Sequence, residues 1–221
     1  MLLIDLLPLV VGAAVLPLWI IAALLLLRSE GGVLKAAAFA AGAMTVRVSQ
    51  GILFGYVFDT AADASGDRSK FITSTLLVVV GILLSIAAFR TWRKEANPNA
   101  PPPKWMATLS GLPSPKAFGI GALLMAISIK QWVFTLAAIA VVYEAKLGLK
   151  GSILAYLAFV LAAQSLVLAP TIACVVAPDR SANLLEMIQS GLERHSRMIT
   201  TAVSLIFGIW FLGKGITGLI G

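Results

Sequence analysis

The sequence predicts an all-α, polytopic membrane protein with six transmembrane helices. Its 221 residues are 59% hydrophobic and only 12% charged, whereas a soluble domain carries about 25% charged residues. The apolar residues gather in six runs, each close to the roughly 20 residues that a transmembrane helix needs. The expected spans comprise residues 2–27, 33–58, 71–89, 117–143, 152–176 and 199–220.

The first half of the chain is expected to be a three-helix repeat over residues 1–89. Its first span contains Pro8 and Pro17, and because each proline removes a backbone donor, we expect a kinked or locally unwound helix. The second span carries Arg47 near its centre, with Gln50 three positions later on the same helical face. The third span has no charged residue and is expected to be a packing helix.

The second half, residues 117–221, is expected to be another three-helix repeat. Lys130 lies near the centre of the fourth span, next to Gln131. The fifth span carries Gln164 and Ser165 near its middle. Pro170 follows them and, like Pro17, is expected to kink its helix and help to open a cavity.

Two segments are expected to lie outside the spans. Residues 90–116 are basic and proline-rich, which is typical of a stiff, extended linker. Trp92 and Trp105 in this linker are expected at the level of the lipid headgroups. Residues 183–198 alternate apolar and charged side chains at helical spacing, which predicts a short helix lying in the membrane interface.

The distribution of basic residues predicts the orientation in the inner (plasma) membrane. Of the 17 Lys and Arg residues, two lie within spans, ten flank the side that holds the linker, and five flank the other side. Basic residues accumulate on the cytoplasmic side, so the linker is expected to be cytoplasmic. Six spans then place both termini outside the cytoplasm.

The two halves show a weak internal symmetry. In each half a tryptophan, a lysine and a glutamine follow one another at similar separations: Trp19, Lys35 and Gln50 in the first, and Trp132, Lys150 and Gln164 in the second. With three spans per half, the second half must enter the membrane from the opposite side. The pattern therefore predicts inverted repeats, a transporter plan in which the binding site lies at the repeat interface.

Arg47 and Lys130 are the candidate site, because no Asp or Glu lies deep in any expected span. An ionisable residue inside a membrane indicates function, and two cations without an acidic partner require an anion from elsewhere. We expect the two to face each other and to hold an anionic substrate together with Gln50, Gln131, Gln164 and Ser165. Structural alternatives stay open: Arg47 could bond to carbonyls at a kink, Lys130 could snorkel, and the glutamines could join helices.

Several other functions are disfavoured. The net charge of +7 is spread over short loops and the linker, which does not indicate nucleic-acid binding. The lone Cys174 excludes an intramolecular thiol–disulfide pair. The single His195 and the scattered acids form no metal-ligand motif, and no nucleophile–base pair is evident. We therefore expect no metal, no cofactor and no enzymatic activity.

The six spans, the basic linker and the lysine of the fourth span resemble the lysine-exporter superfamily. Within it, the chain is most similar to the actinobacterial glycopeptidolipid- and sulfolipid-addressing proteins. That family carries Asn-Pro-Lys in the fourth span, where this chain has Ser128-Ile129-Lys130. In the first span, amino-acid exporters carry Pro-Gly-Pro, where this chain has Pro17-Leu18-Trp19. The resemblance implies outward movement of an anionic or glycosylated lipid, or its precursor, across an actinobacterial inner membrane.

Three functional hypotheses follow from the residues and the resemblance. The first is an exporter or flippase that moves an anionic, lipid-linked substrate outward and grips its headgroup with Arg47 and Lys130. The second is a lysine-exporter-type exporter of an amino acid or another small solute. The third is a non-transporting accessory protein of a larger lipid-export complex. Besides the substrate, the expected partners are membrane lipids, with a homo-oligomer or such a complex left open.

Overall fold

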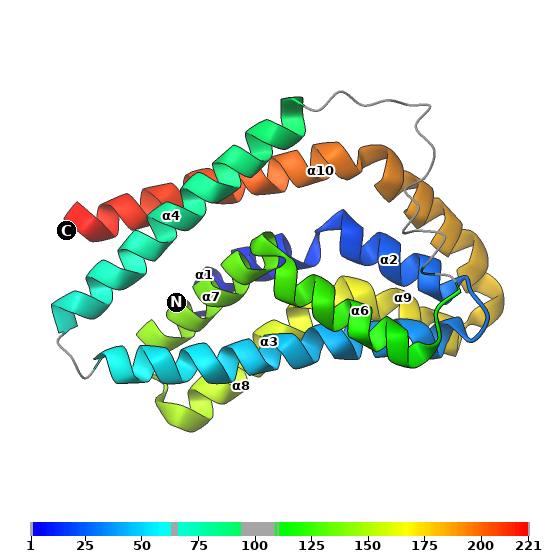
Figure 1. The fold of residues 1–221 in the computed structure, drawn as a ribbon, viewed down its shortest axis with the longest axis horizontal. Helices are drawn as coiled ribbons and strands as arrows, with labels where there is room; N and C mark the ends of the chain where they lie inside the picture. Colours follow the sequence, from blue (N-terminus) through cyan, green and yellow to red (C-terminus); the bar gives the residue numbers. More distant parts are fainter. Residues whose placement is uncertain (1, 63–65, 94–108, 110, 221) are drawn as a thin grey trace.

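The computed structural model describes residues 2–62, 66–93, 109 and 111–220, and every regular element in this part of the chain is a helix (Figure 1). The side chains of a few helical residues, chiefly 58–62, 66–73 and 178–184, lie outside this description. The helices are α1 (Leu2–Ala14), α2 (Pro17–Leu27), α3 (Gly32–Ala62), α4 (Gly66–Arg93), α6 (Ser114–Ile127), α7 (Ile129–Glu144), α8 (Gly148–Ala163), α9 (Ser165–Val176) and α10 (Pro178–Ile220).

Each expected span coincides with one helix or with a pair of helices joined at a sharp bend. The pairs α1–α2, α6–α7 and α8–α9 bend by 54°, 73° and 64°, respectively. The first bend confirms the expected break in the first span: Leu16 is extended and Pro17 occupies the first turn of α2, where its missing N–H costs nothing. The second bend lies at Ser128, whose backbone is also extended.

The described helices provide between two and five candidate membrane spans. Among the described residues, α3 over Gly32–Val57 and α10 over Arg194–Ile220 are each long and apolar enough to cross a membrane. Counting each bent pair as one span raises the total to five. The expected third span lies in α4, which is outside that count, so six spans and inverted repeats remain expectations.

The boundaries in the second half differ from those expected. Residues 183–198 are helical, but they belong to the long helix α10, and no helix end separates them from the expected last span. Nothing in their amphipathic pattern ends the helix, and its position in the membrane interface stays a prediction. The linker expected at 90–116 falls mostly outside the described residues, and its two ends are the last turn of α4 and the first turn of α6.

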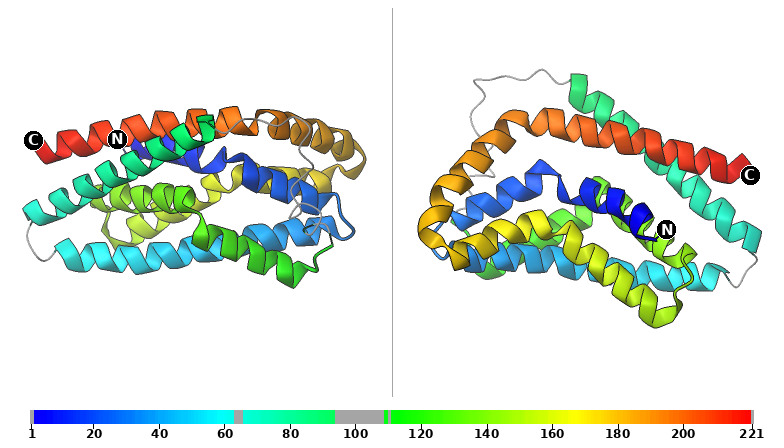
Figure 2. Two further views of the ribbon diagram at one scale, coloured as in Figure 1. Left: turned by 45° about the horizontal axis from the view of Figure 1, so that its top comes forward. Right: turned by 180° about the vertical axis from the view of Figure 1, so that it is seen from behind.

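Helices α4 and α10 lie side by side and run in opposite directions (Figures 1 and 2). Glycines allow this close approach, since a Cβ on Gly215 would lie 2.6 Å from Val78 Cγ2, and one on Gly81 would lie 2.7 Å from the Leu212 backbone nitrogen. Small residues of this kind are enriched where membrane helices pack closely. The Arg197 guanidinium of α10 donates to the carbonyls of Thr91 and Trp92 at the end of α4.

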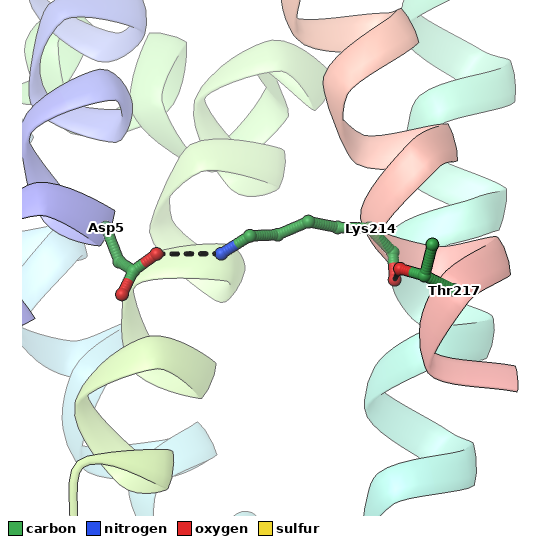
Figure 3. A network of polar contacts seen from close by, with 3 residues as sticks. All are labelled: Asp5, Lys214 and Thr217. Atoms are coloured by element: carbon green, nitrogen blue, oxygen red, sulfur yellow. Dashed lines mark hydrogen bonds and ion pairs between the residues drawn. The ribbon is translucent and has the colours of Figure 1, made fainter. Parts of the chain in front are cut away.

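A second close pair, α3 and α6, contains reciprocal glycine contacts. A Cβ on Gly42 would overlap the Phe118 carbonyl oxygen, and a Cβ on Gly121 would overlap the Phe39 carbonyl oxygen. At the end of the molecule where the termini lie, an ion pair of 2.8 Å between Lys214 and Asp5 connects α10 to α1 (Figure 3).

The α3–α6 contact predicts opposite effects for two neighbouring glycines of α6. Gly121→Ala should lower the free energy of unfolding by about 1–3 kcal/mol, because the new methyl group meets rigid backbone. Gly119→Ala should be neutral or stabilise by up to about 1 kcal/mol, since that side is open and alanine is the better helix former. Thermal unfolding in detergent measures both. Equal midpoints for the two variants would contradict the close packing.

Candidate functional site

The candidate site centres on Arg47, the largest fully buried side chain among the described residues, with 0% of its surface exposed. Its Nη2 donates to Oε1 of Gln131 on α7. Its Nε and Nη1 are buried and have no hydrogen-bond partner within the described part of the chain. The guanidinium carbon lies 5.7 Å from the ring centre of Phe159 on α8, a cation–π contact.

No acidic side chain of the described residues forms an ion pair with Arg47. The Lys214–Asp5 pair lies elsewhere, in a partly exposed position. Removing a charge from water costs several kcal/mol, and the cost is recovered only if a counter-charge and hydrogen bonds compensate it. A glutamine amide and an aromatic face supply partial compensation, so this part of the structure leaves the Arg47 cation short of a negative partner.

Arg47 belongs to a buried polar layer, which we define as the side chains of Arg47, Gln50, Gln131, Thr135 and Gln164. Each of the five has at most 4% of its surface exposed. Both polar atoms of Gln50, Nε2 of Gln164 and Oγ1 of Thr135 have no partner among the described residues. Buried polar groups in proteins are nearly always hydrogen-bonded, so these atoms can accept or donate hydrogen bonds to a further polar group.

The polar layer coincides with the boundary between two apolar clusters. The first cluster surrounds Phe134, Phe207 and Phe211, and the second surrounds Trp19, Phe39 and Met125. Each bent pair passes from one cluster to the other at its bend: between Ala13 and Leu16, between Met125 and Val133, and between Ala163 and Val167. All three helix breaks therefore lie at one level of the molecule, together with Arg47.

Side chains bind several of the backbone carbonyls at this level. Nε2 of Gln131 donates to the Ala13 carbonyl at 3.3 Å, and Nε1 of Trp132 donates to the Ala126 carbonyl at 2.6 Å. The Tyr156 hydroxyl donates to the Arg47 carbonyl at 2.7 Å. The half-helices α2, α7 and α9 begin at this level, and α1, α6 and α8 end there. Partial positive charges of three helix starts and partial negative charges of three helix ends therefore meet in the layer. Its formal charge among these side chains comes from Arg47.

The structure brings together some of the expected site residues and separates others. Arg47 and Gln131 are in contact, and Gln50 and Gln164 are buried in the same layer. Lys130 is only half-buried, and no hydrogen bond or ion pair joins it to Arg47 or to another described residue. Ser165 is exposed. Neighbouring positions on a helix project about 100° apart, so the burial of Gln131 and Gln164 turns Lys130 and Ser165 towards other faces.

Of the two prolines expected to kink their helices, one lies at a helix bend and the other does not. Pro17 is buried and lies directly at the α1–α2 bend. Pro170 lies inside α9, whereas the bend in the fifth span lies between α8 and α9, at Gln164. The bend therefore does not begin at the proline.

Sequence reasoning missed Tyr156 and Phe159, which both contact Arg47 from α8. Their spacing of three residues in an apolar span places two aromatic rings on one helix face. This spacing is the sequence pattern that could have identified them. It also missed Thr135, which lies one turn after Gln131 on the buried side of α7. Among the described residues, no group of three or more His, Cys, Asp or Glu side chains could hold a metal ion.

Comparison with known families identifies the family to which the chain belongs. Residues 6–217, which include the whole polar layer, match the family model described as Sap, sulfolipid-1-addressing protein. The chain belongs to this family. No curated protein and no solved structure matches the chain. The membership supports a lipid-related role, and the apolar helices fit a multi-pass membrane protein.

The Arg47–Gln131 contact predicts the relative stabilities of variants at position 131. Gln131→Leu removes the hydrogen-bond partner of a buried cation and should lower the free energy of unfolding by about 1–3 kcal/mol. Gln131→Glu supplies a counter-charge and should be more stable than Gln131→Leu by about 3 kcal/mol. Thermal unfolding of the purified proteins in detergent measures the order.

Thr135→Val is the matched control for these variants. It changes a buried side chain of the same helix, and it removes a hydroxyl that has no partner among the described residues, so stability should change by less than about 0.5 kcal/mol. If Gln131→Glu were the least stable of the three variants, Arg47 would already have a negative partner.

Proposed function

We propose that this Sap-family protein is an inner-membrane transporter that moves an anionic lipid, or a lipid-linked precursor, outward. The polar layer holds the anionic headgroup. The observation that carries the proposal is the Arg47 guanidinium, which is fully buried and has two nitrogens without a partner among the described residues. The proposal includes a cytoplasmic linker and both termini outside the cytoplasm, as the distribution of basic residues predicts.

The donor chemistry of the layer favours an oxyanion as the occupant. A guanidinium presents a planar fork of N–H groups that matches phosphate, sulfate or carboxylate. The open amide atoms of Gln50 and Gln164 add further hydrogen-bonding capacity. A cationic substrate would meet the Arg47 cation, which has no acidic partner among the described residues, so the same layer would repel it.

The arrangement of the helices supports a transport mechanism. Discontinuous helices whose ends meet at mid-membrane are the binding elements of several transporter folds. Here the first helix pair of each expected half, α1–α2 and α6–α7, is bent. The last helices of the two halves, α4 and α10, run antiparallel (Figure 1). Inverted repeats and membership of the lysine-exporter superfamily are part of the proposal.

Lys130 has a secondary role in this proposal. It lies in the first turn of α7, one residue before the Arg47 partner Gln131, and it is half-buried. From that position it adds positive charge near the layer without joining its contacts. We propose that Arg47 provides the main grip on the headgroup and that Lys130 contributes to it from the side. The layer acts by binding alone, so the proposed function includes no catalysed reaction.

Mass spectrometry of the lipids and solutes that copurify with the protein tests this function. Arg47→Gln should reduce recovery of the bound anion about 10- to 100-fold, the equivalent of losing hydrogen bonds to a charged group. Lys130→Gln should reduce it less. The matched control is Lys150→Gln, which removes an exposed charge far from any bend. Export measured in cells should fall in the same order as recovery.

The outcomes of this experiment separate the three functional hypotheses. An Arg47-dependent lipid supports the proposal, whereas an Arg47-dependent water-soluble anion favours a small-solute exporter. Unchanged recovery and unchanged export in a correctly inserted Arg47→Gln protein would overturn both transport functions and favour an accessory role. Insertion is checked by size-exclusion chromatography, so that a misfolded variant is not counted.

A further inference from the structure

A groove of about 620 Å³ lies along the last turns of α4, outside the polar layer. Ser85, Ile86, Phe89, Arg90 and Arg93 line it. None of these residues belongs to the polar layer. We propose that this groove binds an anionic lipid of the surrounding membrane, with the headgroup at the two arginines and an acyl chain along Ile86 and Phe89.

The order of side chains along α4 matches the parts of such a lipid. The apolar lining residues, Ile86 and Phe89, are both exposed, with 46% and 49% of their surfaces accessible. The basic lining residues, Arg90 and Arg93, follow at the end of the helix. The Arg93 guanidinium carbon lies 4.6 Å from the Phe89 ring centre, which holds the charge directly above the apolar part. A groove with an apolar floor and a cationic rim suits an amphiphile with a negative head.

Among the described side chains, those that bring charge to this end of α4 are arginines. Arg197 of α10 adds a third guanidinium, which donates to the carbonyls of Thr91 and Trp92. These carbonyls are the negative end of the helix, so Arg197 compensates the partial charge that would otherwise repel an anion. No acidic side chain of the described residues forms an ion pair with Arg90, Arg93 or Arg197. Charge complementarity therefore selects an anionic occupant.

The position of the groove favours a membrane lipid over a soluble anion. Trp92 lies beside it with 65% of its surface exposed, and tryptophan is enriched at the level of lipid headgroups. Basic side chains at the end of a membrane helix bind anionic headgroups in the same way. An exposed apolar surface beside the arginines would contribute nothing to binding a soluble phosphate, whereas an acyl chain would cover it.

Native mass spectrometry of the full-length protein in detergent, titrated with phosphatidylglycerol or phosphatidylcholine, tests this site. The protein should bind phosphatidylglycerol more tightly than phosphatidylcholine. Each arginine near a membrane surface contributes about fivefold to the affinity for an anionic lipid, so Arg90→Gln with Arg93→Gln should weaken phosphatidylglycerol binding on the order of twentyfold. Arg90→Lys with Arg93→Lys keeps the charge and should retain most of the affinity.

The matched control is Lys146→Gln with Lys150→Gln, which removes two exposed charges at the α7–α8 connection, outside the groove lining, and should leave binding unchanged. In an Arg47→Gln background, which removes the main grip of the polar layer, the double glutamine substitution should weaken phosphatidylglycerol binding by the same factor. Glycerophosphoglycerol, the headgroup without acyl chains, should not compete. The proposal is wrong if the double glutamine variant binds like the wild type, if the control weakens binding equally, if the double substitution has no effect in the Arg47→Gln background, or if the free headgroup competes as well as the lipid.

Discussion

The burial of one guanidinium without an acidic partner is the constraint on which the middle of this molecule depends. Arg47 is fully buried, and the described residues around it offer an amide oxygen, an aromatic ring and open hydrogen-bonding atoms, but no carboxylate. The three helix breaks lie at the same level as this charge. In a bilayer, irregular backbone is tolerated only where protein or a polar cavity satisfies it. The breaks and the charge therefore require the same polar surroundings.

The sequence predicted the chemistry of the site better than its geometry. Arg47 and the glutamines stand out because they interrupt apolar spans, and the first break follows from Pro17. The break at Ser128 has no proline to signal it. There the Trp132 indole donates a hydrogen bond to the Ala126 carbonyl. A side chain that satisfies a backbone group in this way leaves no recognisable pattern in the sequence. Lys130 shows a second limit of sequence-based prediction. It is half-buried, whereas its neighbour Gln131 is buried, and the sequence pattern did not distinguish the two positions.

The fold combines continuous and broken helices, and the difference between them follows the packing. Helices α4 and α10 are continuous, although α10 curves strongly in its N-terminal part (Figure 1). Glycines and serines allow the close backbone approach of α4 and α10, and α3 packs against α6 through reciprocal glycine contacts. Such contacts tolerate little change in separation, because no flexible side chain lies between the backbones. The bent pairs meet at the polar layer, where hydrogen bonds replace part of the apolar packing.

The amide at position 131 leaves the positive charge of Arg47 available to an anion. A carboxylate in that place would neutralise Arg47 permanently, and any anionic guest would then have to displace it and repay the cost of separating a buried ion pair. Gln131 instead accepts one hydrogen bond from Nη2 and uses its own N–H to hold the Ala13 carbonyl at the α1–α2 bend. The amide thus orients the guanidinium and connects it to the break without cancelling its charge. An anion that binds Arg47 would consequently act, through a single side chain, on the bend of the first span.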